Sequence, residues 1–211
     1  MRLEHPAPFT ARWRASWIWD RPPAIVTQTA TRPVLADPTD RVALLRREVR
    51  LDAVPDDAPC RIWVDGRYSL RVNGAEVARG PVRSEPRQSH YDVVDLASHL
   101  RTGTNVIAIL ARHFGTATSW WMPVPPSYSL GGGGVVFEAR LGDEWIVSDT
   151  SWRASAGDAW SPVPVPGDVA CLPLESFDSR VHPTGWDAPG FDDARWVPAT
   201  QIVPVSTGGR D

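Results

Sequence analysis

Lysine is absent from this chain of 211 residues, so all 22 basic residues are arginine. The 25 acidic residues give a net charge of −3, and the arginines are scattered among them without forming a basic stripe. Proteins that bind nucleic acid need such a stripe to neutralise the phosphates. The composition therefore argues against a nucleic-acid partner.

Long apolar runs are missing as well. The sequence holds no span of about 18 apolar residues, which a transmembrane helix requires. The first 20 residues carry tryptophan, arginine and proline where a signal peptide would have its apolar region. Together these absences predict a protein that has no membrane partner and lies in the cytoplasm.

Cysteine is scarce, and motifs for metals or cofactors are absent. Cys60 and Cys171 lie far apart and lack the paired spacing of metal ligands, so we expect Cys60 to be a small buried residue and not half of a disulfide. The neighbouring Asp56 and Asp57 lack the spacing of a calcium loop. The glycines at 131–134 lack the ending of a phosphate-binding loop. We predict no cofactor and no metal site.

Turn residues are abundant. Twenty-one prolines and 16 glycines separate short apolar runs, and no long stretch has the helical period, which favours an all-β architecture. Tyr68, Leu70 and Val72 alternate with polar residues, as in a strand with one buried face. Asn73 and Gly74 follow, and both tolerate the positive φ that a two-residue hairpin turn needs. This stretch predicts an antiparallel hairpin.

The same patterns predict the remaining elements. The continuous apolar run within 105–114 is typical of a central strand that is covered on both faces. One helical turn is expected at 96–100, and the last fifty residues are expected to be irregular backbone lying over the sheets, with one final strand. The other predicted strands span residues 43–52, 61–65, 91–95, 135–140, 144–148, 152–154 and 196–204.

Five segments, in order along the chain, resemble the N-terminal β-sandwich of bacterial α-L-rhamnosidases (glycoside hydrolase family 78). They read WRASWIW, RYSLRVNG, SHYDVVDLASHLRTGTNVIAILARHFG, SDTSWRAS and GWDAPGFDDARWVPA. The last segment also resembles the sugar-binding jelly rolls of other β-glycosidase families. The resemblance implies a galactose-binding-like jelly-roll β-sandwich with long loops rich in proline and glycine, forming a single domain over residues 1–211 with its core at about 13–200.

The resemblance also implies a function. Enzymes of that family are several times longer and carry their catalytic carboxylates in a helical toroid downstream, a region that this sequence does not include. We therefore expect a non-catalytic carbohydrate-associated module, which binds sugars such as rhamnosides or supports a glycoside hydrolase catalytic domain. Two alternatives stay open: a truncated or partner-dependent hydrolase acting on α-L-rhamnosides, and a protein-docking module without a sugar ligand.

Eleven tryptophans favour the recognition of sugar rings, because pyranose C–H groups stack on aromatic faces. Loops at the end of a rigid sandwich commonly carry binding residues. The alternative is that these rings pack onto the sheet or onto a neighbouring domain. The predicted carbohydrate contacts are Trp120, Trp121 and Tyr128 in the loop after the central strand, and Arg112 and His113 at the end of that strand.

Glycoside hydrolysis needs two carboxylates at a suitable separation. Two pairs occur in loops, namely Glu175 with Asp178 and Asp192 with Asp193. We expect structural roles for both pairs. An aspartate before Ala194 caps a turn by accepting backbone N–H bonds, and Glu175 and Asp178 form ion pairs with Arg180. No catalytic residue is predicted.

Overall fold

A computed structural model describes residues 6–10, 12–22, 28–29, 32–33, 41–82, 90–114, 133–163 and 174–202. Within these residues the fold consists of β-strands and a single 3-10 turn, η1 (Ala97–His99). The strands are β1 (Trp17–Trp19), β2 (Gln28–Thr29), β3 (Arg32–Pro33), β4 (Arg41–Leu51), β5 (Pro59–Val64), β6 (Arg67–Val72), β7 (Ala75–Gly80), β8 (Asp92–Asp95), β9 (Gly103–His113), β10 (Val135–Leu141), β11 (Glu144–Val147), β12 (Arg153–Ala156), β13 (Trp160–Val163), β14 (Leu174–Phe177), β15 (Val197–Pro198) and β16 (Thr200–Ile202).

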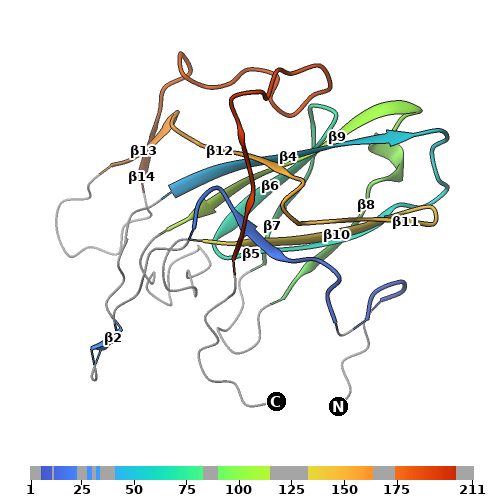
Figure 1. The fold of residues 1–211 in the computed structure, drawn as a ribbon, viewed down its shortest axis with the longest axis horizontal. Helices are drawn as coiled ribbons and strands as arrows, with labels where there is room; N and C mark the ends of the chain where they lie inside the picture. The colour runs from blue at the N-terminus through green and yellow to red at the C-terminus, as the bar shows by residue number, and fades with distance from the viewer. Residues whose placement is uncertain are drawn as a thin grey trace.

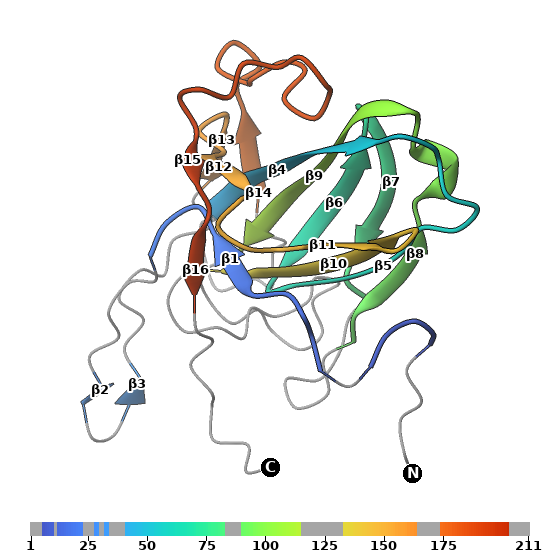
Figure 2. The same ribbon diagram turned by 45° about the vertical axis from the view of Figure 1, so that its right-hand side comes forward.

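Two six-stranded antiparallel sheets face each other (Figures 1 and 2). The β9 sheet has the order β15-β12-β4-β9-β6-β7, and the β10 sheet has the order β16-β1-β10-β5-β8 with β11 also paired to β10. Strands far apart in the chain pair in nested fashion: β4 with β12, β5 with β10 and β6 with β9. Nested antiparallel pairs divided between two sheets are the pattern of a jelly roll. The expected all-β jelly-roll sandwich is therefore confirmed.

Strand β9 is central and buried on both faces, as its apolar run predicted. It pairs with β4 along its whole length and with β6 on its other side. Ile107 and Ile109 face the core between the sheets, together with Phe137 of the β10 sheet. Val106 and Ala108 point the other way, into a second apolar cluster on the outer face of the β9 sheet. That outer face must therefore be covered by another part of the chain.

The C-terminal segment between β14 and β15 provides this cover, and Figure 2 shows it above the β9 sheet in orange and red. Trp186 and Trp196 complete the second cluster. Arg46 of β4 lies beneath the segment, only 1% exposed, and forms an ion pair with Asp193. Its guanidinium carbon lies 5.6 Å from the centre of the Phe191 ring. For the segment between β14 and β15, the prediction that the C-terminal residues lie over the sandwich is confirmed.

The outer face of the β10 sheet is covered by the N-terminal segment. Arg61 of β5 and Glu138 of β10 form an ion pair of 2.9 Å in which both side chains are completely buried. Arg61 also donates hydrogen bonds to the backbone oxygens of Thr10 and Arg12, at 2.8 and 2.9 Å. Its guanidinium carbon lies 4.0 Å from the centre of the Trp13 ring. This single arginine therefore fixes the N-terminal segment onto the sheet.

The observed turns agree in part with those predicted from the sequence. Asn73 and Gly74 have φ of 52° and 86°, so the predicted hairpin between β6 and β7 is confirmed. Gly66 also has a positive φ, of 128°, but the strands on either side of it belong to different sheets, so the chain crosses between sheets there. Residues 160–163 and 174–177 form a hairpin of their own, β13–β14, where irregular backbone was expected, so that expectation was wrong.

Two smaller expectations can be compared with the structure. Cys60 is fully buried and free, as predicted, and burial raises the pKa of its thiol to about 12, which disfavours the reactive thiolate. Cys171 lies outside the described residues. In the part of the chain that the structure describes, no helix is long and apolar enough to cross a membrane.

Candidate functional site

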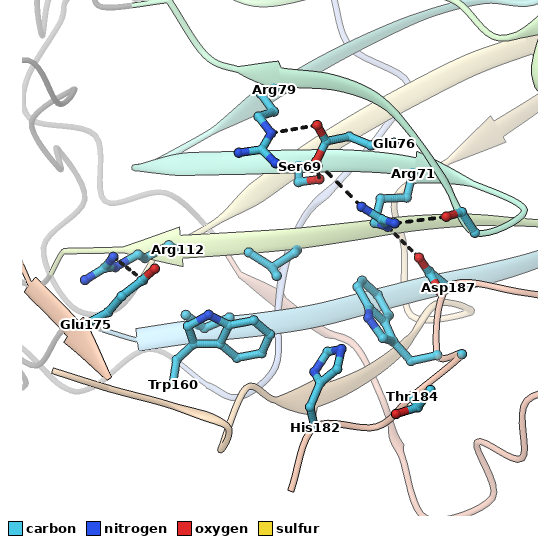
Figure 3. A pocket seen from close by; sticks show the side chains of 15 residues that line it. Ser69, Arg71, Glu76, Arg79, Arg112, Trp160, Glu175, His182, Thr184 and Asp187 are labelled. Carbon is cyan, nitrogen blue, oxygen red and sulfur yellow. Dashed lines mark hydrogen bonds and ion pairs between the residues drawn. The ribbon is translucent and has the colours of Figure 1, made fainter. Parts of the chain in front are cut away.

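A cleft of about 520 Å³ lies on the outer face of the β9 sheet, beside the C-terminal cover (Figure 3). Ser69 and Arg71 of β6 and Leu110 and Arg112 of β9 line it from the sheet. They point outward because strand residues alternate, and their neighbours along each strand face the core. The opposite wall is formed by Trp160 at the start of β13 and by the segment 182–187.

Trp160 and His182 form an aromatic wall of the cleft, and Phe177, which does not itself line the cleft, contacts both rings. Trp160 lies 4.9 Å from Phe177, its cross-strand partner in the β13–β14 hairpin, measured between ring centres. His182 contacts the same indole edge-on at 5.3 Å. Trp160 and His182 are both drawn among the residues that line the cleft in Figure 3. A half-buried indole held by neighbouring rings offers a rigid surface for an apolar ligand face.

The environment of His182 favours the neutral form of its imidazole. Burial lowers the pKa of its imidazole below the usual 6.5, the charge of Arg71 lowers it further, and Asp187 opposes both effects. Its Nδ1 atom is buried and has no hydrogen-bond partner among the described residues. The ring therefore contributes mainly an uncharged surface beside Trp160.

Arg71 organises one end of the cleft. Its guanidinium donates to the backbone oxygen of Gly74 at 2.9 Å and forms an ion pair with Asp187. A second carboxylate, that of Glu76, lies 3.6 Å away. Arg71 thereby connects the β6–β7 hairpin to the C-terminal cover, and Figure 3 shows its contact with Asp187.

Glu76 and Glu175 are held by other arginines. Glu76 accepts hydrogen bonds from Arg79 at 2.6 Å and from Ser69 at 2.9 Å. The bond from Arg79 is the main reason that the pKa of Glu76 lies below its usual value. At the other end of the cleft, Arg112 and Glu175 form an ion pair of 2.5 Å (Figure 3). Each carboxylate in the cleft lining is thus paired with an arginine.

This arrangement suits binding better than proton transfer. A glycosidase needs a protonated carboxylic acid, and an apolar environment is what keeps a carboxyl group protonated. Pairing with arginine has the opposite effect, because it favours the ionised form. Paired guanidinium and carboxylate groups offer donors and acceptors side by side, which match neighbouring hydroxyls of a neutral ligand.

The structure separates the two predicted contacts that are next to each other in sequence. Arg112 lines the cleft. His113 points to the opposite face of β9 and is 1% exposed, with its Nδ1 atom 3.4 Å from the backbone oxygen of Asp65. The three predicted aromatic contacts, Trp120, Trp121 and Tyr128, lie outside the described residues. Their role in sugar binding stays a prediction.

The other carboxylates considered from the sequence have structural partners. Asp178 pairs with Arg180 at 2.6 Å, as expected, whereas Glu175 pairs across the cleft with Arg112 instead. Asp192 caps a turn by accepting the backbone N–H of Ala194 at 3.0 Å, which was also expected. Asp57 accepts two hydrogen bonds from Arg140, each 2.9 Å long.

The contributors to the cleft that sequence reasoning missed include Arg71, Trp160, His182 and Asp187. The alternation in β6 placed Arg71 on the outward face, and this was the one available signal. The other three come from segments that reach the β9 sheet only after the chain has folded. No local pattern marks them as members of one site.

The jelly-roll topology and the open cleft on the β9 sheet define the protein as an all-β sandwich domain with a surface cleft. Comparison with known families narrows this class. The family described as "Alpha-L-rhamnosidase N-terminal domain" matches residues 55–208. The chain therefore belongs to the family of α-L-rhamnosidase N-terminal domains.

Individual relatives agree with this assignment. An α-L-rhamnosidase of Streptomyces avermitilis is 28% identical over 98% of this chain, which spans 16% of that enzyme. The crystal structure of a family GH78 rhamnosidase from Bacillus sp. GL1 is 30% identical, with a TM-score of 0.72 over 94% of this chain and 19% of the other. An α-L-rhamnosidase from Aspergillus terreus shares the fold, with a TM-score of 0.65 and 21% identity over 90% of this chain and 21% of the other. The chain thus spans about a fifth, or less, of the length of these relatives.

Proposed function

We propose that this domain binds carbohydrate in the cleft on the outer face of the β9 sheet and does not hydrolyse it. The observation that carries the proposal is the presence of an aromatic wall and an arginine–carboxylate pair in one cleft. Trp160 provides a face for the C–H groups of a sugar ring, and the pair of Arg112 with Glu175 provides donors and acceptors for its hydroxyls.

Membership of this family favours one particular sugar as the ligand. Two of the relatives described above, at 28% and 30% identity, are named as rhamnosidases. An accessory domain that holds a rhamnoside raises the local concentration of substrate for a catalytic domain joined to it. Rhamnose-containing glycans are therefore the proposed ligands, and a rhamnosidase-type catalytic domain is the proposed partner.

The proposal is tested by isothermal titration of the 211-residue chain with L-rhamnose and with rhamnosylated oligosaccharides. Arg112→Gln removes the cation of the Arg112–Glu175 pair and is expected to weaken binding about tenfold or more, equivalent to about 1.4 kcal/mol. Arg140→Gln is the matched control, because Arg140 also pairs with a carboxylate, that of Asp57, but does not line the cleft. It is expected to leave the affinity unchanged.

The double variant Trp120→Ala/Trp121→Ala tests the loop residues predicted from the sequence. If this variant alone abolishes binding and Arg112→Gln does not, the ligand binds to the loop and the cleft assignment is wrong. If no sugar binds to the wild-type chain, carbohydrate recognition is overturned, and a docking role for the domain becomes the better explanation.

A further inference from the structure

We propose that the cleft continues into a second subsite, so that the domain binds an oligosaccharide of at least two neutral sugar residues and not a single sugar. This inference rests on the proposed function. A second depression of about 460 Å³ adjoins the cleft and extends from the outer face of the β9 sheet past its edge strand β7 to Asp92 of the β10 sheet. The two depressions share five lining residues: Ser69, Arg79, Leu110, Arg112 and Glu175.

The shared residues make the two depressions one groove. Ser69 and Leu110 are paired directly across β6 and β9, so they form a common floor. Arg112 and Glu175 form their ion pair at the end of the cleft that is farther from Asp187 in Figure 3. The groove continues from there into the second depression, which places this ion pair at the junction of two subsites.

The second subsite has a different chemistry from the first. In place of Trp160 and His182 it has a polar pair at the edge between the two sheets, in which the hydroxyl of the largely buried Tyr68 donates to Asp92 at 2.6 Å. Val82, which is 59% exposed, adds an aliphatic contact at its edge. Gly80 keeps this region open, because a Cβ atom at that position would overlap the Asp92 carboxylate and the Tyr68 ring. One sugar would therefore stack on Trp160, while the next is held by hydrogen bonds beyond the junction.

The charges of the groove favour a neutral chain. Among the residues that the structure describes, its two parts together are lined by four arginines (Arg67, Arg71, Arg79, Arg112) and four carboxylates (Glu76, Asp92, Glu175, Asp187). An anionic glycan would need an excess of arginine over acidic groups. Equal numbers match a ligand whose polar groups are hydroxyls.

The test compares L-rhamnose with α-linked rhamnose disaccharide and trisaccharide by isothermal titration of the 211-residue chain. We expect the disaccharide to bind about tenfold more tightly than the monosaccharide, because it occupies both subsites. Val82→Ser and Asp92→Asn, both in the second subsite, are expected to reduce the disaccharide affinity several-fold and to leave the monosaccharide affinity unchanged. Val54→Ser is the matched control, since Val54 is 40% exposed and lines neither depression.

The outcomes separate this inference from the proposed function. If the monosaccharide and the longer sugars bind with affinities within about twofold of each other, the second subsite is overturned while carbohydrate binding stands. The same conclusion follows if Val82→Ser and Asp92→Asn weaken the monosaccharide as much as the disaccharide. If none of the sugars binds, the inference and the proposed function are both overturned.

Discussion

The two outer faces of the sandwich are covered in different ways. The N-terminal segment lies on the β10 sheet, held by the fully buried pair of Arg61 and Glu138. The C-terminal segment lies on the β9 sheet, held by Arg46 and Asp193, and leaves the cleft open beside it. At the edge of that opening, Arg112 and Glu175 are 14% and 45% exposed. The same kind of ion pair thus fixes a chain segment on one face and lines a binding surface on the other.

The difference follows from solvation. An ion pair removed from water is favourable only when further hydrogen bonds satisfy both groups. Arg61 and Glu138 meet this condition through the backbone of the N-terminal segment, whose Arg14 N–H also donates to Glu138 at 2.7 Å. Arg112 and Glu175 remain partly hydrated, so they can exchange water for the hydroxyls of a ligand.

The largest expected effect comes from breaking the buried pair. Glu138→Leu leaves the charge of Arg61 without a partner and is expected to lower the free energy of unfolding by about 3–5 kcal/mol. Urea denaturation measures this loss. The double variant Arg61→Leu/Glu138→Leu should recover a large part of it, because no unpaired charge remains. A loss below about 1 kcal/mol in the single variant would show that the pair behaves like a surface pair.

The cover on the other face should be weaker. Arg46→Leu is expected to cost about 1–3 kcal/mol, because the partner Asp193 is 27% exposed and regains water. Hydrogen exchange should also show faster exchange at the Trp196 amide, which donates to the backbone oxygen of Asp193 in the cover. Unchanged exchange at Trp196 would mean that the cover is held by its apolar contacts and not by Arg46.

His182 should make the free energy of unfolding of the protein depend on pH. Its pKa is lowered in the folded protein, so the unfolded chain takes up a proton first as the pH falls below about 6.5. The free energy of unfolding is therefore expected to decrease from that pH down to the folded pKa of His182. His182→Gln should flatten this part of the stability curve relative to wild type. Identical curves for the two proteins would contradict the lowered pKa.

The smallest effect is expected at a pair that lies on neither cover. Arg140 and Asp57 are 33% and 61% exposed, so Arg140→Gln should change the free energy of unfolding by less than about 0.5 kcal/mol. Thermal unfolding at low and at high salt should give the same small difference. If Arg140→Gln lowers the free energy of unfolding as much as Arg46→Leu does, solvent exposure does not explain the difference between the two ion pairs.

The sequence predicted the strands because alternation is a local property. Tyr68, Leu70 and Val72 face the core as their spacing indicated, and the run of β9 is covered on both sides. In β4 the same alternation places Arg46 on the face opposite to Leu45 and Val49, and the structure buries this polar position. The alternation correctly separated the two faces of β4, but it carried no information about a cover that comes from residues about 150 positions later.

The cleft was largely hidden from sequence reasoning for the same reason. Arg71 meets Asp187 across 116 positions, and Arg112 meets Glu175 across 63. Arg112 was proposed because it ends the central strand, which is a local signal. The sugar contacts predicted in the following loop, and the cytoplasmic location, stay predictions.

The strands that end the described sandwich have a mechanical consequence. Strands β1 and β16 are antiparallel neighbours, with Trp17 opposite Ile202. The chain therefore enters at residue 17 and leaves at residue 202 from the same end of this short ladder, about 5 Å apart as in any strand pair. Tension between these two points opens the ladder one bond at a time instead of shearing all its bonds together. When tension is applied at residues 17 and 202, the β1–β16 pair should separate first. The rest of the sandwich should remain folded until that pair has separated.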